Sequence, residues 1–381
     1  MMMESKKPER ITKLDGLRGI LSLIVALNHS FLVVAIPAFA NVWGQNYFEF
    51  HDLQSKIQQL LMILGNGGAA VTLFFILSGL VLGQSLSRVE FSPRSLFAFI
   101  TKRLIRLYPV YIFVILLIAL YMRLGFVYQT FPQASLWYIW WMNFEMTFKE
   151  FFYNLFFIHT YLGGVTWTLR VIVIASFIIP IFYHFTRKTS WFVDLLIAVA
   201  LIYADFTIFN IPDFRDLRYL YMFFLGLMLP KFKQFFSHFP NWYIALTLPV
   251  TLVILLVTRY MTDEYVGGVF EAIVSWKLIG LIIYSDKTKL FDFLDNKTLQ
   301  FFGKISYSLY LIHFSILYIL ARFMFLYLPN LPYADYYLTI HFVLLILSTL
   351  IATGVSLLVY KYVEIPSLSL SNRVSKKILG Q

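Results

Sequence analysis

The chain has 381 residues, of which 60% are hydrophobic, 19% aromatic and only 13% charged, with a formal net charge of +11. A soluble domain carries about 25% charged residues, so the composition excludes a soluble enzyme and a disordered chain. A disulfide scaffold is excluded because the chain has no cysteine. We therefore expect an integral membrane protein, whose positive charge reflects the sidedness of the membrane rather than binding to nucleic acid.

Ten apolar runs follow one another along the chain, each of which could cross a bilayer, a crossing that takes about 20 residues. The first run follows a basic start and is too long for the core of a signal peptide. The fifth and sixth runs are short, and an acidic stretch separates them. The predicted spans are 14–36, 68–84, 104–124, 167–186, 190–206, 217–232, 241–259, 266–284, 304–325 and 339–362.

The basic residues indicate how these spans are oriented. With the N-terminus inside and alternating spans, 21 of the 31 basic residues lie inside, seven lie outside and three lie within spans. This bias follows the positive-inside rule. We therefore predict an all-α integral membrane bundle of about ten transmembrane helices with both termini cytoplasmic, in the cell membrane of a bacterium. Residues 1–381 would form a single membrane domain with short cytoplasmic tails, 1–13 and 365–381.

Two segments are predicted to lie outside the membrane, 37–60 and 125–166. The second contains a stretch, 148–158, with its charges on one side. That pattern is typical of an amphipathic helix lying at the outer membrane surface. Both segments carry aromatic residues that would suit the faces of a sugar, although interfacial anchoring explains them equally well.

The first span contains ionisable residues that are expensive in lipid and are therefore candidates for function. Arg18 and His29 are eleven residues apart, so they share one helix face and lie about 16 Å apart along its axis. The alternative is that Arg18 reaches lipid phosphates and that His29 only makes a hydrogen bond between helices.

Three further clusters stand out. Ser306, Tyr310 and His313 share one face of a later span, where they could join helices or line a polar cavity. Arg103 and Arg106 lie one turn apart at the cytoplasmic end of another span, where they satisfy the topology rule and would also suit a phosphate-rich ligand. Further candidate residues are Ser78, beside a glycine that allows close helix approach, and Trp167 and Arg170, at the outer end of a span.

In this order, the clusters resemble the motifs of the membrane acyltransferase-3 family, multi-span enzymes that O-acylate sugars and related acceptors. The resemblance covers almost the whole chain. The segments that carry it are the first-span pair Arg18 and His29, FFILSG (Phe74–Gly79), the pattern Arg103, Arg106 and Pro109, WTL (Trp167–Leu169), GKISYSLYLIH (Gly303–His313) and a terminal Val363–Pro366.

The resemblance implies an acyl-CoA donor, usually acetyl-CoA, reached from the cytoplasm, and a hydroxyl acceptor on a glycan or lipid-linked sugar. We expect acyl-CoA as co-substrate, no bound cofactor and no metal. The bilayer and the acceptor glycan or glycolipid would be partners, and a homodimer is left open. The expected roles are catalysis for His29, Tyr310 and His313, donor binding for Arg18, Arg103, Arg106 and Ser78, and acceptor or oxyanion contact for Trp167, Arg170 and Ser306.

One position departs from the family pattern. Many members carry a glutamate three residues after the leucine of the Trp-Ser/Thr-Leu motif, and here that residue is Ile172. Candidates for a replacement carboxylate are Asp15, Glu145 and Glu271. His29 could act as a general base or carry the acyl group covalently. A transporter or flippase for a lipid-linked sugar, and a catalytically altered relative acting as a partner, are the alternative functions.

Overall fold

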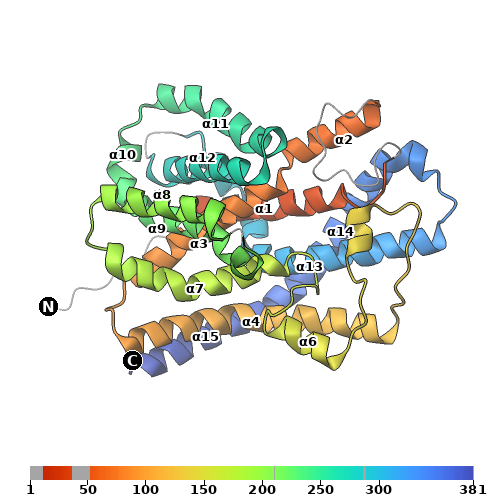
Figure 1. Ribbon diagram of the computed structural model, residues 1–381, viewed down its shortest axis with the longest axis horizontal. Coiled ribbons are helices and arrows are strands. Elements are labelled where there is room, and N and C mark those ends of the chain that lie inside the picture. The colour runs from red at the N-terminus through yellow and green to blue at the C-terminus, as the bar shows by residue number, and fades with distance from the viewer. Residues whose placement is uncertain (1–11, 37–51, 210, 286–288, 381) are drawn as a thin grey trace.

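The computed structural model describes residues 12–36, 52–209, 211–285 and 289–380, and its regular elements are helices (Figure 1). Among these described residues no β-strand occurs beyond an isolated bridge between Val34 and Ala134, so the predicted all-α class is confirmed. The helices are α1 (Thr12–Ser30), α2 (Leu53–Leu64), α3 (Gly67–Leu86), α4 (Pro93–Leu124), α5 (Leu136–Trp140), α6 (Phe148–Leu155), α7 (Thr166–Thr186), α8 (Trp191–Thr207), α9 (Leu220–Met228), α10 (Lys233–Ser237), α11 (Asn241–Met261), α12 (Glu264–Tyr284), α13 (Lys297–Tyr327), α14 (Tyr333–Val359) and α15 (Ile365–Leu379). Short turns of 3₁₀ helix are η2 (Pro212–Tyr219), η3 (Leu229–Phe232) and η4 (Asp292–Asp295), and a π-helical turn, η5 (Tyr360–Glu364), joins α14 to α15.

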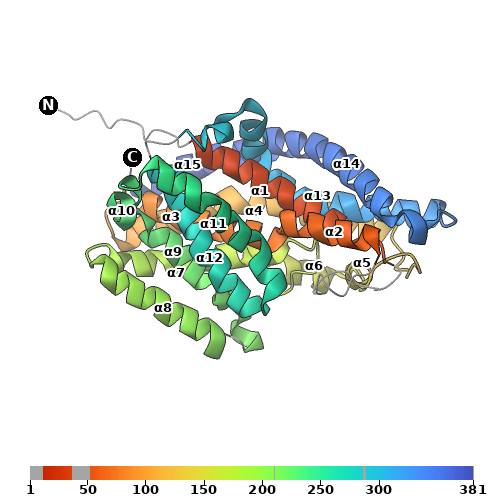
Figure 2. The same cartoon turned by 90° about the horizontal axis from the view of Figure 1, so that it is seen from above.

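Seven helical segments in the described chain are long and apolar enough to cross a membrane. Each contains one of the predicted apolar runs, which confirms a multi-pass membrane protein. These segments are α2 with α3, α4, α7, α11, α12, α13, and α14 with α15. In Figure 2 the helices run broadly along one direction, with α8 and α14 at opposite edges of the bundle.

The other three predicted spans are not among these seven segments, so the count of ten is not confirmed. The first span, expected at 14–36, ends at Ser30, and the following segment pairs with residues 133–135 instead. The run 190–206 forms α8, which has 17 residues. The run 217–232 is divided: α9 has only nine residues and lies between two 3₁₀ turns. Pro230 contributes to that division because it has no backbone N–H to donate.

Glycines allow two helix pairs to approach closely. A Cβ at Gly79 of α3 would lie 1.9 Å from the carbonyl oxygen of Phe223 in α9, and one at Gly226 would lie 1.9 Å from that of Ile76. In the same way, a Cβ at Gly303 of α13 would lie 2.1 Å from the carbonyl oxygen of Asp15 in α1. Small residues at such contacts permit the backbone approach on which helix association in membranes depends.

The predicted outer segment 125–166 contains two short helices, α5 and α6. The helix expected at 148–158 is observed as α6, which has eight residues; its place at the membrane surface stays a prediction. Residues 37–51 of the other predicted outer segment lie outside the described part of the chain.

A buried ion pair joins three helices. The carboxylate of Glu271 in α12 is fully buried and lies 2.6 Å from Nη2 of Arg259 in α11. It also accepts a hydrogen bond of 3.0 Å from Asn66, which caps the N-terminus of α3. Removing one member would leave an uncompensated buried charge, so we interpret this cluster as structural.

The glycine contacts predict the effect of adding one methyl group. Gly79→Ala should destabilise the protein by about 1–3 kcal/mol, because the new Cβ overlaps a backbone oxygen that cannot turn away. Gly354→Ala in α14 is the matched control, since nothing lies within 4 Å of its added Cβ. Thermal unfolding of the purified proteins in detergent measures both. Equal stability of the two variants would contradict the close contact between α3 and α9.

Candidate active site

The candidate site starts from the contact between α1 and α13. Gly19 of α1 faces α13, where an added Cβ would lie 2.5 Å from the carbonyl oxygen of Leu299 and 2.8 Å from the amide nitrogen of Gly303. The two helices therefore pack backbone against backbone near the ends that are predicted to face the cytoplasm. Further along the same pair, this packing brings His29 of α1 to His313 of α13, which lie 284 residues apart in the sequence.

The two histidines form a directed chain of hydrogen bonds. Nδ1 of His313 lies 3.1 Å from the carbonyl oxygen of Leu309, and because a carbonyl only accepts, this nitrogen carries the proton. Nε2 of neutral His313 is then an acceptor for the N–H at Nδ1 of His29, 3.0 Å away. A neutral His29 consequently keeps its lone pair on Nε2. The fold thus selects the tautomer of His29 that has a basic nitrogen at the far side of the ring.

Aromatic rings enclose this pair. The ring of His29 lies 5.5 Å from Trp137 and 5.7 Å from Phe314, centroid to centroid. His313 is 2% exposed, whereas His29 is half-buried. His313 is therefore shielded from solvent, whereas His29 stays partly accessible.

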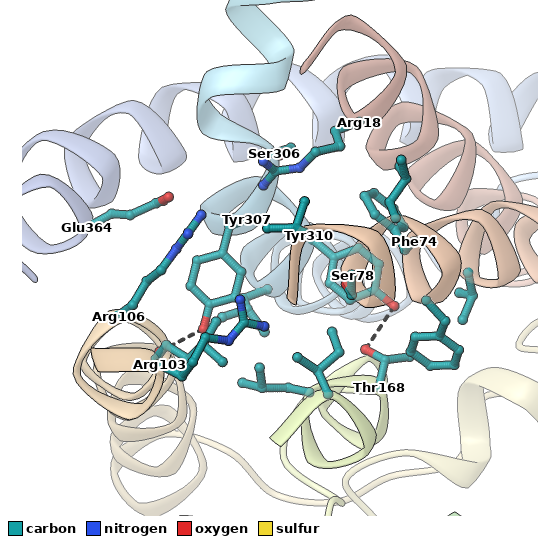
Figure 3. Close-up of a pocket in the computed structure, with 18 residues that line it drawn as sticks. Arg18, Phe74, Ser78, Arg103, Arg106, Thr168, Ser306, Tyr307, Tyr310 and Glu364 are labelled. Atoms are coloured by element: carbon teal, nitrogen blue, oxygen red, sulfur yellow. Dashed lines mark hydrogen bonds between the residues drawn. The ribbon is translucent and has the colours of Figure 1, made fainter. Parts of the chain in front are cut away.

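A cavity of about 140 Å³ lies between α1, α3, α4, α7 and α13 (Figure 3). Three arginines predicted as donor ligands, Arg18, Arg103 and Arg106, line it together. Ser78 and Ser306 line it as well, and much of the remaining wall is apolar. Figure 3 shows Arg103 and Arg106 coming from α4 and Arg18 from α1, so only the tertiary structure brings Arg18 to the other two.

The charges of two of these arginines are not neutralised by direct contacts. Among the residues that the structure describes, neither Arg103 nor Arg106 has a hydrogen bond or an ion pair, and Nε of Arg103 is buried. Arg18 is different, since its Nη1 lies 3.8 Å from Asp15. Excess positive charge in an enclosed space strengthens binding of an anion because the surroundings have a low dielectric.

Glu364 also lines the arginine cavity, and it was missing from the predicted site residues. It lies in the π-helical turn η5, and its carboxylate accepts a hydrogen bond of 2.6 Å from Ser308. In Figure 3 the side chain of Arg106 extends toward it. π-Helical turns recur at functional sites. The terminal Val-Glu-x-Pro motif was the sequence signal that could have identified this residue.

Tyr310 lies between the cavity and the histidine pair. Its ring is 5.9 Å from that of His313 and 5.7 Å from that of Phe74, which also lines the cavity. Its hydroxyl is hydrogen bonded to Thr168, 3.1 Å away (Figure 3). The histidines are not among the cavity-lining residues, so Tyr310 connects the arginine-lined space to the histidine pair through its contact with His313.

Two predicted acceptor residues are not brought to the cavity. Nη2 of Arg170 lies 2.8 Å from Asp216, a partner that sequence reasoning missed. Trp167 packs against Phe75 and Tyr219, with ring centroids 6.3 and 5.4 Å away. Their roles toward an acceptor stay predictions.

Ile172, where many family members carry glutamate, lines the cavity. None of the three candidate replacement carboxylates does. Asp15 lies beside Arg18, Glu145 is an exposed partner of Arg123, and Glu271 is engaged by Arg259. Within the described chain, Glu364 is the carboxylate that lines this space.

The fold and the site together define a multi-pass membrane protein with a histidine pair beside an arginine-lined cavity. A family model described as an acyltransferase domain matches residues 11–361. The chain therefore belongs to the acyltransferase-3 family, as its motifs predicted, and the family supports transfer of an acyl group to a hydroxyl. No curated protein matches the chain, and no solved structure does.

The arginines yield a stability prediction. Arg103→Gln should raise the melting temperature of the ligand-free protein, because it removes a charge that has no partner among the described residues and that is repelled by its neighbours. Arg170→Gln is the comparison variant, and it should lower stability by about 1 kcal/mol because it breaks the ion pair with Asp216. Thermal unfolding in detergent measures both. A loss for Arg103→Gln as large as that for Arg170→Gln would show that Arg103 is held by an interaction in the resting protein.

Proposed function

We propose that the protein transfers an acyl group, acetyl in the simplest case, from acyl-CoA to a hydroxyl of a glycan or lipid-linked sugar, with His29 as the general base. The observation that carries this proposal is the hydrogen-bond chain from Leu309 through His313 to His29. That chain leaves a lone pair on Nε2 of His29, the atom that a general base requires.

Donor binding is assigned to the arginine-lined cavity. The nucleotide portion of acyl-CoA is polyanionic, and phosphate groups form strong charge-assisted bonds with guanidinium groups. We place this end of the molecule, and both chain termini, on the cytoplasmic side of a bacterial cell membrane, in line with the excess of basic residues predicted there. The acyl arm would then extend along α1 toward His29, about 16 Å beyond Arg18.

The proposed reaction conserves protons and electron pairs. Nε2 of His29 takes the proton of the acceptor hydroxyl while the acceptor oxygen bonds to the thioester carbonyl carbon. The carbon–sulfur bond then breaks, and the departing thiolate takes the proton back from His29, leaving an ester and a free thiol. His313 stabilises the transient positive charge on His29 through their hydrogen bond. The hydroxyl of Tyr310 is the candidate donor to the oxyanion.

The acceptor is assigned to the side of His29 that the aromatic residues Trp137 and Trp141 occupy. Trp137 lies 6.3 Å from Trp141, and both contact Phe314. Indole rings present flat apolar faces with a polar edge, which suits the alternating faces of a sugar. Acceptor and donor would thus approach the base from different ends of the bundle.

The assignment of His29 as the base predicts how the rate changes when its basic nitrogen, Nε2, is removed. His29→Gln should lower kcat about 100-fold or more, within the range attributed to general bases, with little change in the amount of folded protein. The assay incubates inverted membrane vesicles with labelled acetyl-CoA and measures acylated glycan. His238→Gln is the control, because that histidine is exposed at the end of α10. Undiminished transfer by His29→Gln would overturn the base assignment, and glycan flux without acylation in the wild type would favour a transporter.

If the arginines bind the phosphates of the donor, removing one arginine should weaken binding only of donors that carry these phosphates. Arg106→Gln should raise the KM for acetyl-CoA about 10- to 100-fold, which corresponds to one or two charge-assisted hydrogen bonds, and should leave kcat nearly unchanged. An acetyl-pantetheine donor, which lacks the nucleotide phosphates, should show the same KM for wild type and variant. Lys377→Gln in α15 is the control, since Lys377 does not line the cavity. An equal rise in KM for both donors would contradict a phosphate-binding role.

A further inference from the structure

The segment that directly follows His29 is held by hydrogen bonds from three other parts of the chain. The carbonyl oxygen of Phe31 accepts a bond of 2.7 Å from the side chain of Gln58 in α2. Residues 33–35 pair with residues 133–135 through two backbone bonds of 2.9 Å each. The remaining contact comes from His341 in α14 and differs from these in being made by a titratable, completely buried side chain.

His341 accepts a hydrogen bond from the main chain. The backbone N–H of Val34 donates to Nε2 of His341 over 3.1 Å, and the side chain of His341 is 0% exposed. An accepting Nε2 means that the proton of the neutral ring lies on Nδ1. That Nδ1 is buried and has no hydrogen-bond partner among the residues that the structure describes. A buried donor without a partner destabilises a fold. The rest of the structure therefore offsets the cost of removing this N–H group from water.

The bond to Val34 acts on the surroundings of His29 through a short path. Val34 forms the isolated bridge with Ala134, and the neighbouring Ser135 binds the carbonyl oxygen of Leu32 through its hydroxyl. The same hydroxyl caps α5 by accepting from the N–H of Tyr138. Trp137 is the second residue of α5, and its ring lies against that of His29.

We propose that His341 is a positioning residue for the acyl-transfer reaction: its Nε2 fixes Val34, and the paired segments then hold Trp137 against the His29 ring. This inference rests on the proposed function, because it concerns the orientation of the same base. His341 does not line the arginine cavity, and among the described residues no hydrogen bond joins it to His29 or His313, so its effect is on the placement of the base and the acceptor side.

Two similar substitutions separate this role from a general contribution to folding. In His341→Gln, the amide oxygen of glutamine can reach the position of Nε2 and accept from Val34. In His341→Asn, the shorter side chain cannot, although it is equally neutral and polar. His341→Asn should lower kcat about 10- to 100-fold, the scale of a misplaced catalytic group. It should leave the KM for acetyl-CoA unchanged, and His341→Gln should recover most of the loss.

A second measurement does not depend on activity. Hydrogen–deuterium exchange followed by mass spectrometry should show faster exchange in peptides covering 31–36 and 133–138 for His341→Asn, and near wild-type exchange for His341→Gln. Peptides from α4, which carries Arg103 and Arg106, serve as the internal control and should exchange alike in all three proteins. A change confined to the paired segments is what the positioning role requires.

The outcomes are distinct. Undiminished kcat in folded His341→Asn, or equal losses in the asparagine and glutamine variants, would overturn the proposal. Faster exchange across the whole protein would also overturn it, since that is the signature of general destabilisation. An inactive wild type would count against the proposed acyl transfer alone, and the exchange comparison would still decide whether His341 holds the segment after His29.

Discussion

The close approach of α1 and α13 is the contact on which the site depends. Gly19 and Gly303 let the two backbones touch, and a Cβ at either would lie within 3 Å of main-chain atoms of the partner helix. Gly16 allows the same approach to the turn η4, which directly precedes α13. Lipid supplies no hydrophobic drive to bring helices together, so close packing of small residues must do so. Because the helices meet in this way, His29 and His313 come within hydrogen-bond distance although each is held by a different helix.

The site divides two kinds of chemistry between its ends. At one end, Arg18, Arg103 and Arg106 outnumber the single carboxylate, Glu364, among the residues that line the cavity, an excess of positive charge that would suit an anion. At the other end, two hydrogen-bonded histidines are enclosed by aromatic rings, and Nδ1 of His313 lies 3.1 Å from the carbonyl oxygen of Leu309. This separation matters because a cation placed beside the histidines would repel the positive charge that forms when a base accepts a proton. Tyr310 and Thr168 lie at the boundary between the two environments.

Much of the site could be predicted because helical spacing and the cost of polar groups in lipid are visible in a single chain. The two predicted histidines are hydrogen bonded to one another. One cavity is lined by five of the other predicted residues, Arg18, Arg103, Arg106, Ser78 and Ser306. Arg170 and Trp167 do not join them, because each is occupied by neighbours from η2 and α3 that no local pattern reveals. Glu364 was missed for a related reason: its motif was recognised, but only the packing of the π-helical turn η5 against the bundle brings it to the cavity that the arginines line.

Composition and periodicity alone determined that this chain is a helical membrane protein, since hydrophobic runs of spanning length and scarce charge have no stable alternative in water. The ordered motifs determined its family. Only the tertiary structure decided three further features. These are the residue at which α1 ends, the division of the run 217–232, and the nitrogen of His29 that keeps its lone pair. The physical reason is that each of these depends on hydrogen bonds or contacts between residues far apart in the chain. His341 to Val34, 307 positions apart, is the longest-range example of such a bond at this site.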